Sequence, residues 1–362
     1  MNNPVNIVVV GGGTAGIAAA VTAARTGCRT VLLDQRPAAG GTGGFSGLTT
    51  LCGLFDGKGD FINEGFAREF AGAVGEGAPV RMGKVWVLMY RPERFRAEAA
   101  RLLSKEPNLQ TCWNTPLADI KLEGSRVTRV NGLPVGAVID CSGTAEVARA
   151  VQAECLAADE ITQAPAVLFP LHDVTCKLDS PVAAAQVLLP LARAGFPPLN
   201  FQPGFDPGVV TVKFTGRPDQ VPALIDFLRD NIPGFKKCRT LVREFLPAAR
   251  AGRMIVGQYT LTGADVLEGR RFSDGAARCS WPIEQWGGDG VARFRYLPEN
   301  LHYEIPARSL RAARIENLFM AGKTISADID AIASARVMGC CLATGEAAGH
   351  LAARYVQSST TK

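Results

Sequence analysis

The chain has 362 residues, of which 47% are apolar and 20% are charged, and its formal net charge is +5. This composition is ordinary for a globular protein and is long enough for one large or two medium domains. The positive excess is mild and no run of lysine or arginine stands out, so the sequence gives no indication of a nucleic-acid partner. A mild positive balance suits an anionic cofactor and an anionic substrate.

The amino terminus and the cysteines predict a cytoplasmic protein. The first apolar strand begins within five residues of Met1, which leaves no room for a signal peptide, and no apolar run reaches the length of a membrane span. Ten cysteines in such a chain indicate reduced thiols. The adjacent pair Cys340-Cys341 is poorly placed for a disulfide or a tetrahedral metal site. With only three scattered histidines, at 172, 302 and 350, we expect no metal centre.

The most informative stretch is an apolar strand that runs directly into a glycine turn, Val8 to Gly16. Gly11, Gly13 and Gly16 fit the pattern G-x-G-x-x-G, in which the glycines permit a tight turn, close approach of a pyrophosphate and close helix packing. A helix ending near Gly27, a strand over Thr30–Leu33 and the acidic Asp34 follow in the order that a dinucleotide-binding unit requires. The alternative is a glycine turn in a unit that binds no nucleotide.

A second glycine-rich segment follows Asp34. Gly40 to Gly47 contains too many glycines for a regular helix or strand, and we interpret it as backbone that lies against a cofactor. A flexible surface loop is the alternative interpretation.

The other elements mix helices and strands. Helices are predicted at 60–75 with Asp60 as N-cap, and at 92–105, 181–194, 219–231 and 342–355. Strands are predicted at 84–90, 127–130, 135–139, 166–176, 209–214 and 317–322, and 109–113 and 117–122 are predicted to be hairpin-like. The strand at 135–139 stops at Asp140-Cys141-Ser142-Gly143, as a parallel sheet does where it meets a ligand. Gly345 and Gly349 indicate close packing of the last helix on a sheet.

Six segments together resemble FAD-dependent oxidoreductases: VVVGGGTAGIAAA, GGTGGFSG, VIDCSGTAEVA, WPIE, YEIPARSL and the carboxyl-terminal NLFMAGKTISADIDAIASARVMGCCLATGEAAG. The resemblance implies an α/β fold with a three-layer, Rossmann-like FAD-binding domain around a parallel sheet. This domain would be built from residues 1–155 and 300–362, and an inserted α+β substrate domain would span 156–299. An alternative division assigns residues 60–92 to the substrate side.

The resemblance also gives roles to individual residues. Gly11, Gly13 and Gly16 would hold the FAD pyrophosphate, Asp34 would bind the adenosine ribose, and Ser142 and Gly143 would lie beside the adenosine. Further residues along the cofactor would be Thr14, Ala15, Gln35, Gly40, Gly41, Thr42, Gly44 and Leu117. Gly322 and Ser326 would lie beside the ribityl chain, and Arg336, Met338 and Gly339 would lie beside the isoalloxazine. A helix that begins near Met338 would turn its free amides and positive dipole end toward reduced flavin, whereas the alternative is a plain core helix.

The sequence departs from the family pattern at three places. Lys323 stands where arginine is usual, Gly339-Cys340 replaces a common Pro-Thr pair, and Gln285-Trp286 follow WPIE in place of His-Asp. The last change lies near the expected substrate side, so the family's substrate is not carried over.

Three residues are candidates for chemistry at the flavin. Cys52 is a candidate redox thiol or attachment point, although a buried structural cysteine is the favoured interpretation. His302 and Tyr303 are candidates for an acid or base at the substrate face, with an exposed pair in an edge strand as the alternative. Glu284 and Arg308 are further candidates for contacts to a carboxylate.

The sequence favours a flavin dehydrogenase or oxidase that transfers a hydride from a small organic substrate to flavin N5. Because only one dinucleotide fingerprint is present, we expect no stable nicotinamide domain. Oxygen, a quinone or another carrier would accept the electrons, or NAD(P)H would meet the flavin transiently. The alternatives are a flavoprotein monooxygenase or halogenase-like enzyme that acts on a partner protein, a flavin-binding protein without turnover, and an NAD-dependent dehydrogenase.

Overall fold

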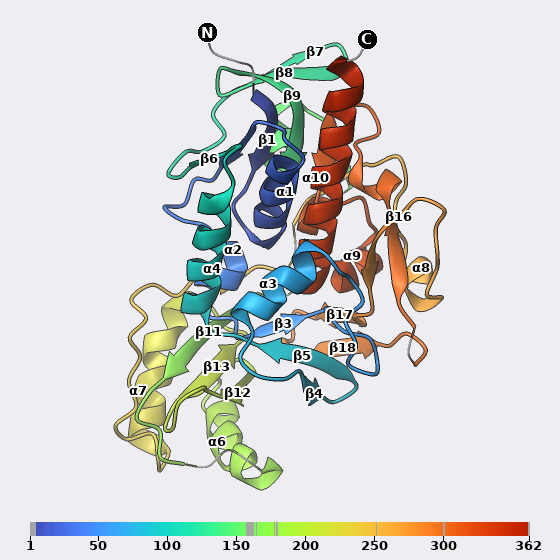
Figure 1. The fold of residues 1–362 in the computed structure, drawn as a ribbon. Helices are drawn as coiled ribbons and strands as arrows, with labels where there is room; N and C mark the ends of the chain where they lie inside the picture. The colour runs from blue at the N-terminus through green and yellow to red at the C-terminus, as the bar shows by residue number, and fades with distance from the viewer. Residues whose placement is uncertain are drawn as a thin grey trace.

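The computed structural model describes residues 5–156, 163, 165–176, 178, 180–250, 252–299 and 301–360. Its centre is a sheet with the strand order β6-β2-β1-β9, and β20 also pairs with β9 (Figure 1). All these pairs are parallel. The strands are β1 (Val5–Val10), β2 (Thr30–Leu33), β6 (Leu109–Cys112), β9 (Leu133–Asp140) and β20 (Leu318–Met320). This parallel sheet confirms the predicted α/β, Rossmann-like fold.

The expected hairpin-like pairing of 109–113 with 117–122 is wrong. β6 pairs in parallel with β2, from Thr30 opposite Leu109 to Leu33 opposite Cys112. Instead, β7 (Ile120–Glu123) forms a hairpin with β8 (Arg126–Val130), and β8 joins the start of β9. Closeness along the chain therefore does not decide the pairing here, because the free edge of β2 offers β6 a longer-range partner.

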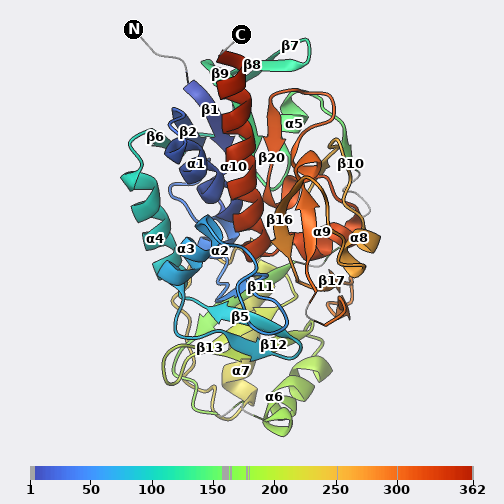
Figure 2. The same ribbon diagram turned by 45° about the vertical axis from the view of Figure 1, so that its right-hand side comes forward.

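Two helices with many small residues cover one face of the parallel sheet. Helix α1 (Thr14–Arg25) follows the glycine turn, and helix α10 (Met338–Thr360) lies beside it, as Figures 1 and 2 show. A Cβ at Gly349 would come within 2.7 Å of the carbonyl oxygen of Ala19 in α1. The close packing predicted for Gly345 and Gly349 is present, but the partner is helix α1 and not the sheet.

The helix expected at 60–75 is shorter, since α3 spans Phe66–Val74. Gly65, with φ of 68°, occupies its N-cap position, and Glu346 of α10 accepts a hydrogen bond from the Phe66 amide at 3.0 Å. Asp60 therefore does not cap this helix, and its amide instead donates to the side chain of Asp56. The prediction for α4 (Pro92–Lys105) is confirmed at both ends.

The second glycine-rich segment contains a short helix, α2 (Gly41–Phe45), which corrects the expectation of an irregular backbone. The Gly44 amide donates to the Gly40 carbonyl at 3.0 Å. Side chains from neighbouring elements hold the turn: Tyr90 donates to the Gly43 carbonyl at 2.7 Å and Arg96 to the Gly44 carbonyl at 2.6 Å. Tertiary contacts thus override the low helix propensity of glycine.

A second sheet lies below the parallel sheet in both views, away from the two termini (Figures 1 and 2). Its order is β12-β13-β11-β14, with β11 (Ala166–Leu171), β12 (Leu199–Pro203), β13 (Val210–Phe214) and β14 (Pro247–Ala248). Helices α6 (Pro181–Arg193) and α7 (Val221–Asn231) accompany it. Residues of β11 and β13 and of α7 share one buried apolar cluster, separate from the main core.

Smaller sheets complete the structure. β3 (Thr50–Cys52), β5 (Val85–Met89) and β4 (Val80–Met82) form one, and β17 (Ile283–Trp286) pairs with β18 (Ala292–Arg295). β16 (Gly275–Cys279) pairs with β19 (Tyr303–Pro306), and β10 (Cys155–Leu156) with β15 (Met254–Ile255). The remaining helices are α5 (Glu146–Ala150), α8 (Gly263–Leu267), α9 (Ile329–Ala335) and the 3-10 turns Pro218–Gln220, Ala307–Leu310 and Gly322–Thr324.

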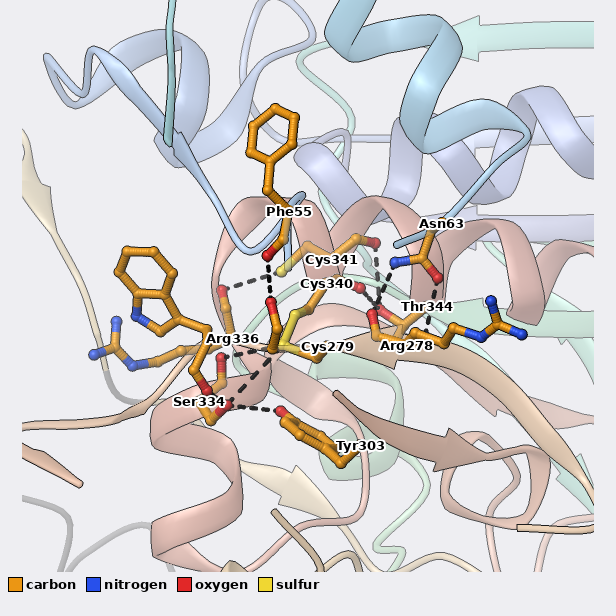
Figure 3. Close-up of a disulfide and its surroundings, with 12 residues drawn as sticks. Phe55, Asn63, Arg278, Cys279, Tyr303, Ser334, Arg336, Cys340, Cys341 and Thr344 are labelled. Atoms are coloured by element: carbon orange, nitrogen blue, oxygen red, sulfur yellow. Dashed lines mark hydrogen bonds between the residues drawn. A yellow bond between two sulfur atoms is a disulfide. The ribbon is translucent and has the colours of Figure 1, made fainter. Parts of the chain in front are cut away.

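A disulfide joins Cys279 of β16 to Cys340 in the first turn of α10 (Figure 3). Both residues are fully buried in the main core. The expectation that all ten cysteines are reduced is therefore wrong for this pair, because the fold brings together two residues that are 61 apart in the sequence.

Within the described ranges, none of the helices combines the length and the apolar character that crossing a bilayer requires. Over the same ranges, no group of three or more histidine, cysteine, aspartate or glutamate residues is placed to hold a metal ion.

Candidate active site

A cavity of about 680 Å³ opens at the carboxyl edge of the parallel sheet. Its walls include the residues that directly follow β1, β2, β9 and β20, namely Gly11, Asp34, Cys141 and Ala321. In open α/β sheets, ligands bind at this edge, where the strand order reverses. The cavity continues to residues of the second sheet, including Leu168 of β11 and Lys213 of β13.

The glycine turn after β1 leaves space on its cavity side. A Cβ at Gly11 would lie 2.6 Å from the Cys141 carbonyl oxygen, and one at Gly16 would lie 1.7 Å from the Gly11 oxygen. Both glycines are therefore required by the protein's own backbone. Gly13 differs, because the nearest atom to its Cβ would be the Gly41 Cα at 3.8 Å. The protein itself leaves room at Gly13, the position where the fingerprint requires room for a phosphate.

Asp34 holds the same turn from the end of β2. Its Oδ2 accepts a hydrogen bond from the Gly12 amide at 2.5 Å, and its Oδ1 accepts one from the Arg36 amide at 2.7 Å. The side chain also lines the cavity. Asp34 thus links the glycine turn to the segment that follows β2.

The two glycine segments lie against each other. The Gly40 amide donates to the Gly12 carbonyl at 2.9 Å, and a Cβ at Gly41 would come within 2.7 Å of the Gly13 Cα. Gly41 has φ of 50°, in the left-handed region that glycine adopts most readily. Of this segment, Gly41 and Thr42 line the cavity.

The turn after β9 is organised by the buried carboxylate of Asp140. It accepts hydrogen bonds from the Ser142 hydroxyl at 2.6 Å and from the Val147 amide at 3.0 Å. Burial raises the pKa of Asp140, and these hydrogen bonds oppose that rise. The turn presents Ser142 and Gly143 to the cavity.

A cluster of charged side chains forms another part of the wall: Lys213 from β13, Arg250 after β14, Glu284 from β17 and Arg336 after α9. The Glu284 carboxylate accepts a hydrogen bond from the indole of Trp281 at 2.8 Å and one from the indole of Trp286 at 2.6 Å. Burial alone would raise the pKa of Glu284, but Arg336 and Lys213 lower it below its usual range. Glu284 is therefore ionised.

The cations of this cluster are held by aromatic and backbone groups. Lys213 Nζ lies 4.0 Å and Arg250 Cζ lies 3.9 Å from the centre of a Trp286 ring. Arg336 Nη2 donates to the Glu284 carbonyl and to Gln163 Oε1, each at 3.1 Å. Burial lowers the pKa of Lys213 to about 8 and that of Arg250 to about 10. Burial also lowers the pKa of Arg336, but a guanidinium stays protonated in proteins, so all three side chains carry charge at neutral pH.

The structure brings most of the predicted cofactor residues to this one cavity: Gly11, Gly13, Thr14, Ala15, Asp34, Gln35, Gly41, Thr42, Leu117, Ser142, Gly143, Gly322, Arg336 and Met338. Five predicted residues, all within the described part of the chain, lie outside its lining: Gly16, Gly40, Gly44, Ser326 and Gly339. They make close contacts within the protein; for example, a Cβ at Gly339 would come within 2.5 Å of the Gly53 carbonyl oxygen, and the Ser326 hydroxyl lies 3.1 Å from that of Thr260.

Of the three candidates for chemistry, Cys52 lies on the cavity. Burial raises the pKa of its thiol to about 12, so the nucleophilic thiolate is scarce at neutral pH. Tyr303 is fully buried, with its hydroxyl 2.8 Å from that of Ser334 (Figure 3), and His302 contacts Arg271. The structure does not place His302 or Tyr303 among the cavity residues that it describes.

Lys213 and Arg250 are the main cavity residues that sequence reasoning missed. Each is a single basic residue in a stretch without a motif, and only the pairing of β11 with β13 and β14 brings them to the same wall. A lysine within the apolar alternation Val210-Thr211-Val212-Lys213-Phe214 was the one available signal, because buried lysines are rare.

The parallel sheet, the glycine turn and the cavity at the sheet's carboxyl edge define a dinucleotide-binding α/β protein. The chain belongs to the FAD-dependent oxidoreductase family, since the family model described as "FAD dependent oxidoreductase" matches residues 6–208 and 198–362. It is therefore an oxidoreductase with FAD as its cofactor. A search among curated proteins gives no match.

Solved structures share the fold at low sequence identity. The chain is similar to a geranylgeranyl bacteriochlorophyll reductase-like protein from Thermoplasma acidophilum, with a TM-score of 0.51, 15% identity and coverage of 98% of this chain and 79% of the other. It is similar to p-nitrophenol 4-monooxygenase PnpA from Pseudomonas putida, with a TM-score of 0.52, 13% identity and coverage of 99% of this chain and 82% of the other. It is also similar to GidA from Aquifex aeolicus, with a TM-score of 0.51, 14% identity and coverage of 98% of this chain and 64% of the other. At these identities the likeness establishes the fold alone.

Proposed function

We propose that the protein is an FAD-dependent dehydrogenase or oxidase that oxidises a small organic substrate. The observation that carries the proposal is the single cavity, which joins the glycine turn at the sheet edge to the charged cluster of Lys213, Arg250, Glu284 and Arg336. A site for a dinucleotide and a site for a second molecule therefore share one enclosed space, as a direct redox reaction between them requires.

The residues at the sheet edge fit FAD. Gly13 would admit the pyrophosphate at the N-terminus of α1, because space remains there and the helix amides and dipole favour an anion. Asp34, Thr42 and Ser142 would hold the remainder of the cofactor along the cavity. Helix α10 begins at Met338, which lines the cavity, so the positive end of this helix would face the flavin ring. When bound, FAD supplies a two-electron acceptor that takes up a hydride at N5.

This chain's own residues would bind and orient the substrate. Glu284 is fixed by two indole donors, so its charge stays in place near Lys213 and Arg336. The apolar side chains Leu48, Val87 and Leu168 exclude water from the same wall. The Cys52 thiol remains neutral there. Oxygen, a quinone or another carrier would accept the electrons afterwards.

Spectroscopy of the purified protein tests this function. We expect a yellow protein whose absorbance near ~450 nm, from its flavin chromophore, is bleached by an organic donor without oxygen. Admitting oxygen then distinguishes an oxidase, which recovers its colour, from a dehydrogenase that needs another acceptor. Oxygen consumption with NADH that depends on an added aromatic compound would instead establish a monooxygenase and contradict the proposal.

A further inference from the structure

Within the part of the chain that the structure describes, the charged cluster has three cations and one acid. Lys213, Arg250 and Arg336 are the cations, and Glu284 is the acid. Among the other cavity residues, Asp34 hydrogen-bonds the glycine turn and Glu146 begins helix α5, at the sheet edge. An anion bound beside these partly desolvated cations would gain more attraction than it would at the surface.

The acid of the cluster is already engaged. Both oxygens of Glu284 accept indole hydrogen bonds, so its capacity for further donors is reduced. Arg336 has a complementary feature: its Nε atom is buried and, among the described residues, no partner accepts its proton. A buried guanidinium donor without an acceptor is costly, and an oxyanion in the cavity would satisfy it.

The cations come from elements that do not form the glycine turn. Lys213 and Arg250 belong to the second sheet and the segment after it, and Trp286 of β17 packs against both. The pyrophosphate of FAD is accounted for by the N-terminus of α1 and the space at Gly13. The cluster is therefore available to a second anion.

The neighbouring wall is apolar and leads toward the surface. Met82, Val85 and Val87 of the β4–β5 hairpin line it, together with Phe294 and Tyr296 of the β18 segment. Phe294 and Tyr296 stack with ring centres 5.9 Å apart and are 43% and 41% exposed. Apolar side chains that line a cavity while reaching solvent mark its mouth, and they suit a ligand with an apolar body.

We propose that the substrate is an organic carboxylate whose anionic group binds among Lys213, Arg250 and Arg336. Its apolar body lies against Val85, Val87 and Phe294, toward the mouth of the cavity. A carboxylate matches the two-pronged guanidinium of arginine better than a neutral amide or alcohol does, because each N–H donor meets a charged oxygen. This inference rests on the proposed function, since it names the class of molecule that the second part of the cavity takes.

Equilibrium binding to the FAD-loaded protein tests the inference. Benzoate and hexanoate are titrated at pH 7, each against its neutral isostere, benzamide and hexanamide, with calorimetry and the visible flavin spectrum as readouts. We expect at least one carboxylate to bind about tenfold or more tightly than its amide. If neither carboxylate binds more tightly than its amide, the proposal is wrong.

Matched variants locate the binding. We expect Lys213→Met and Arg250→Met each to weaken the preferred carboxylate by about tenfold or more, with little change for the amide. The controls are Lys237→Met and Arg253→Met, at exposed positions outside the cavity lining, and they should bind as the wild type does. Because Lys213 and Arg250 lie on different segments, one of the two variants suffices if the other loses its FAD. Carboxylate binding that survives in every folded cluster variant overturns the assignment.

The outcomes separate this inference from the proposed function. Tight carboxylate binding without bleaching by any organic donor would contradict the proposed oxidation but support the anion site. Bleaching by neutral donors, with no preference for carboxylates, would support the oxidation and overturn the anion site.

Discussion

Gly345 of helix α10 lies so close to Ala15 of helix α1 that a Cβ on Gly345 would come within 2.2 Å of the Ala15 carbonyl oxygen. Ala15 itself lines the cavity, one residue before Gly16. The contact between the two helices therefore reaches the position where the dinucleotide site begins. A change in this helix contact should therefore alter both the free energy of unfolding and the shape of the dinucleotide site.

Gly345→Ala should destabilise the protein by about 1–3 kcal/mol, because the added methyl group forces the two backbones apart. The urea midpoint of unfolding measures this loss. Gly72→Ala is the matched control, since Gly72 lies exposed in helix α3 with nothing within 4 Å of its would-be Cβ. There the same change should stabilise by about 0.5–1 kcal/mol. Equal midpoints for Gly345→Ala and the wild type would refute the close packing.

Gly13→Val should abolish FAD retention while the chain still folds. The backbone at Gly13 has φ of −79° and ψ of −171°, which a valine adopts without strain, and the cavity has room for its side chain. The valine would occupy the space assigned to the pyrophosphate. The ratio of flavin to protein absorbance after purification measures retention, and circular dichroism checks the fold.

Gly288→Val provides the control for that experiment. Gly288 lies in the turn between β17 and β18, is exposed, and has nothing within 4 Å of its would-be Cβ. This variant should keep its FAD. Stoichiometric FAD in purified Gly13→Val would show that the pyrophosphate lies elsewhere.

Removing the disulfide should lower stability. The bond links residues that are 61 apart in the sequence. Without it the unfolded chain gains conformational entropy, which lowers the free energy of unfolding by about 4 kcal/mol in the loop-entropy treatment, whereas about 2–4 kcal/mol is typical of measurements. The double variant Cys279→Ala, Cys340→Ala should therefore unfold at a lower urea concentration than the untreated wild type. Thiol titration of the denatured wild type should give 8 thiols without reductant and 10 with it. Ten thiols without reductant would contradict the bond.

Carboxylate binding should weaken as the pH rises through about 8. Burial lowers the pKa of Lys213 to about 8, so the ammonium is present below that pH and is lost above it. The groups that face it are Glu284, Arg250, Arg336 and Cys52, and of these Glu284 is already ionised while Cys52 titrates only near 12. Benzoate titrations between pH 6 and pH 9 check the trend, and Lys213→Met should remove it. A wild-type affinity independent of pH over this range would exclude Lys213 as a binding group.

The sequence predicted the parts of the site whose residues lie close together along the chain. The glycine turn, β2 and Asp34 form a continuous pattern in which each residue type has a local backbone reason, so their mutual positions follow from the order along the chain. The start of α10 near Met338 was also predictable, because the motif around Arg336 resembles that of the family.

The residues that the sequence did not reveal are brought together by long-range pairing. Lys213 and Arg250 meet only because β13 and β14 both pair with β11. Likewise, the partners of β6 and of Gly345 lie far along the chain, where local periodicity carries no information. The short helix α2 formed against the propensity of its glycines because Tyr90 and Arg96 hold its carbonyls.

The contact between α1 and α10 also sets an order of events when the protein is made. Helix α1 leaves the ribosome long before helix α10, which covers it in the finished fold. Until then, Ala18 and Ala19, which are fully buried in the finished fold and pack against Gly345 and Gly349 of α10, lack this cover. A newly made chain therefore exposes this apolar face until α10 emerges, and the nucleotide end of the cavity acquires its final shape only when α10 docks.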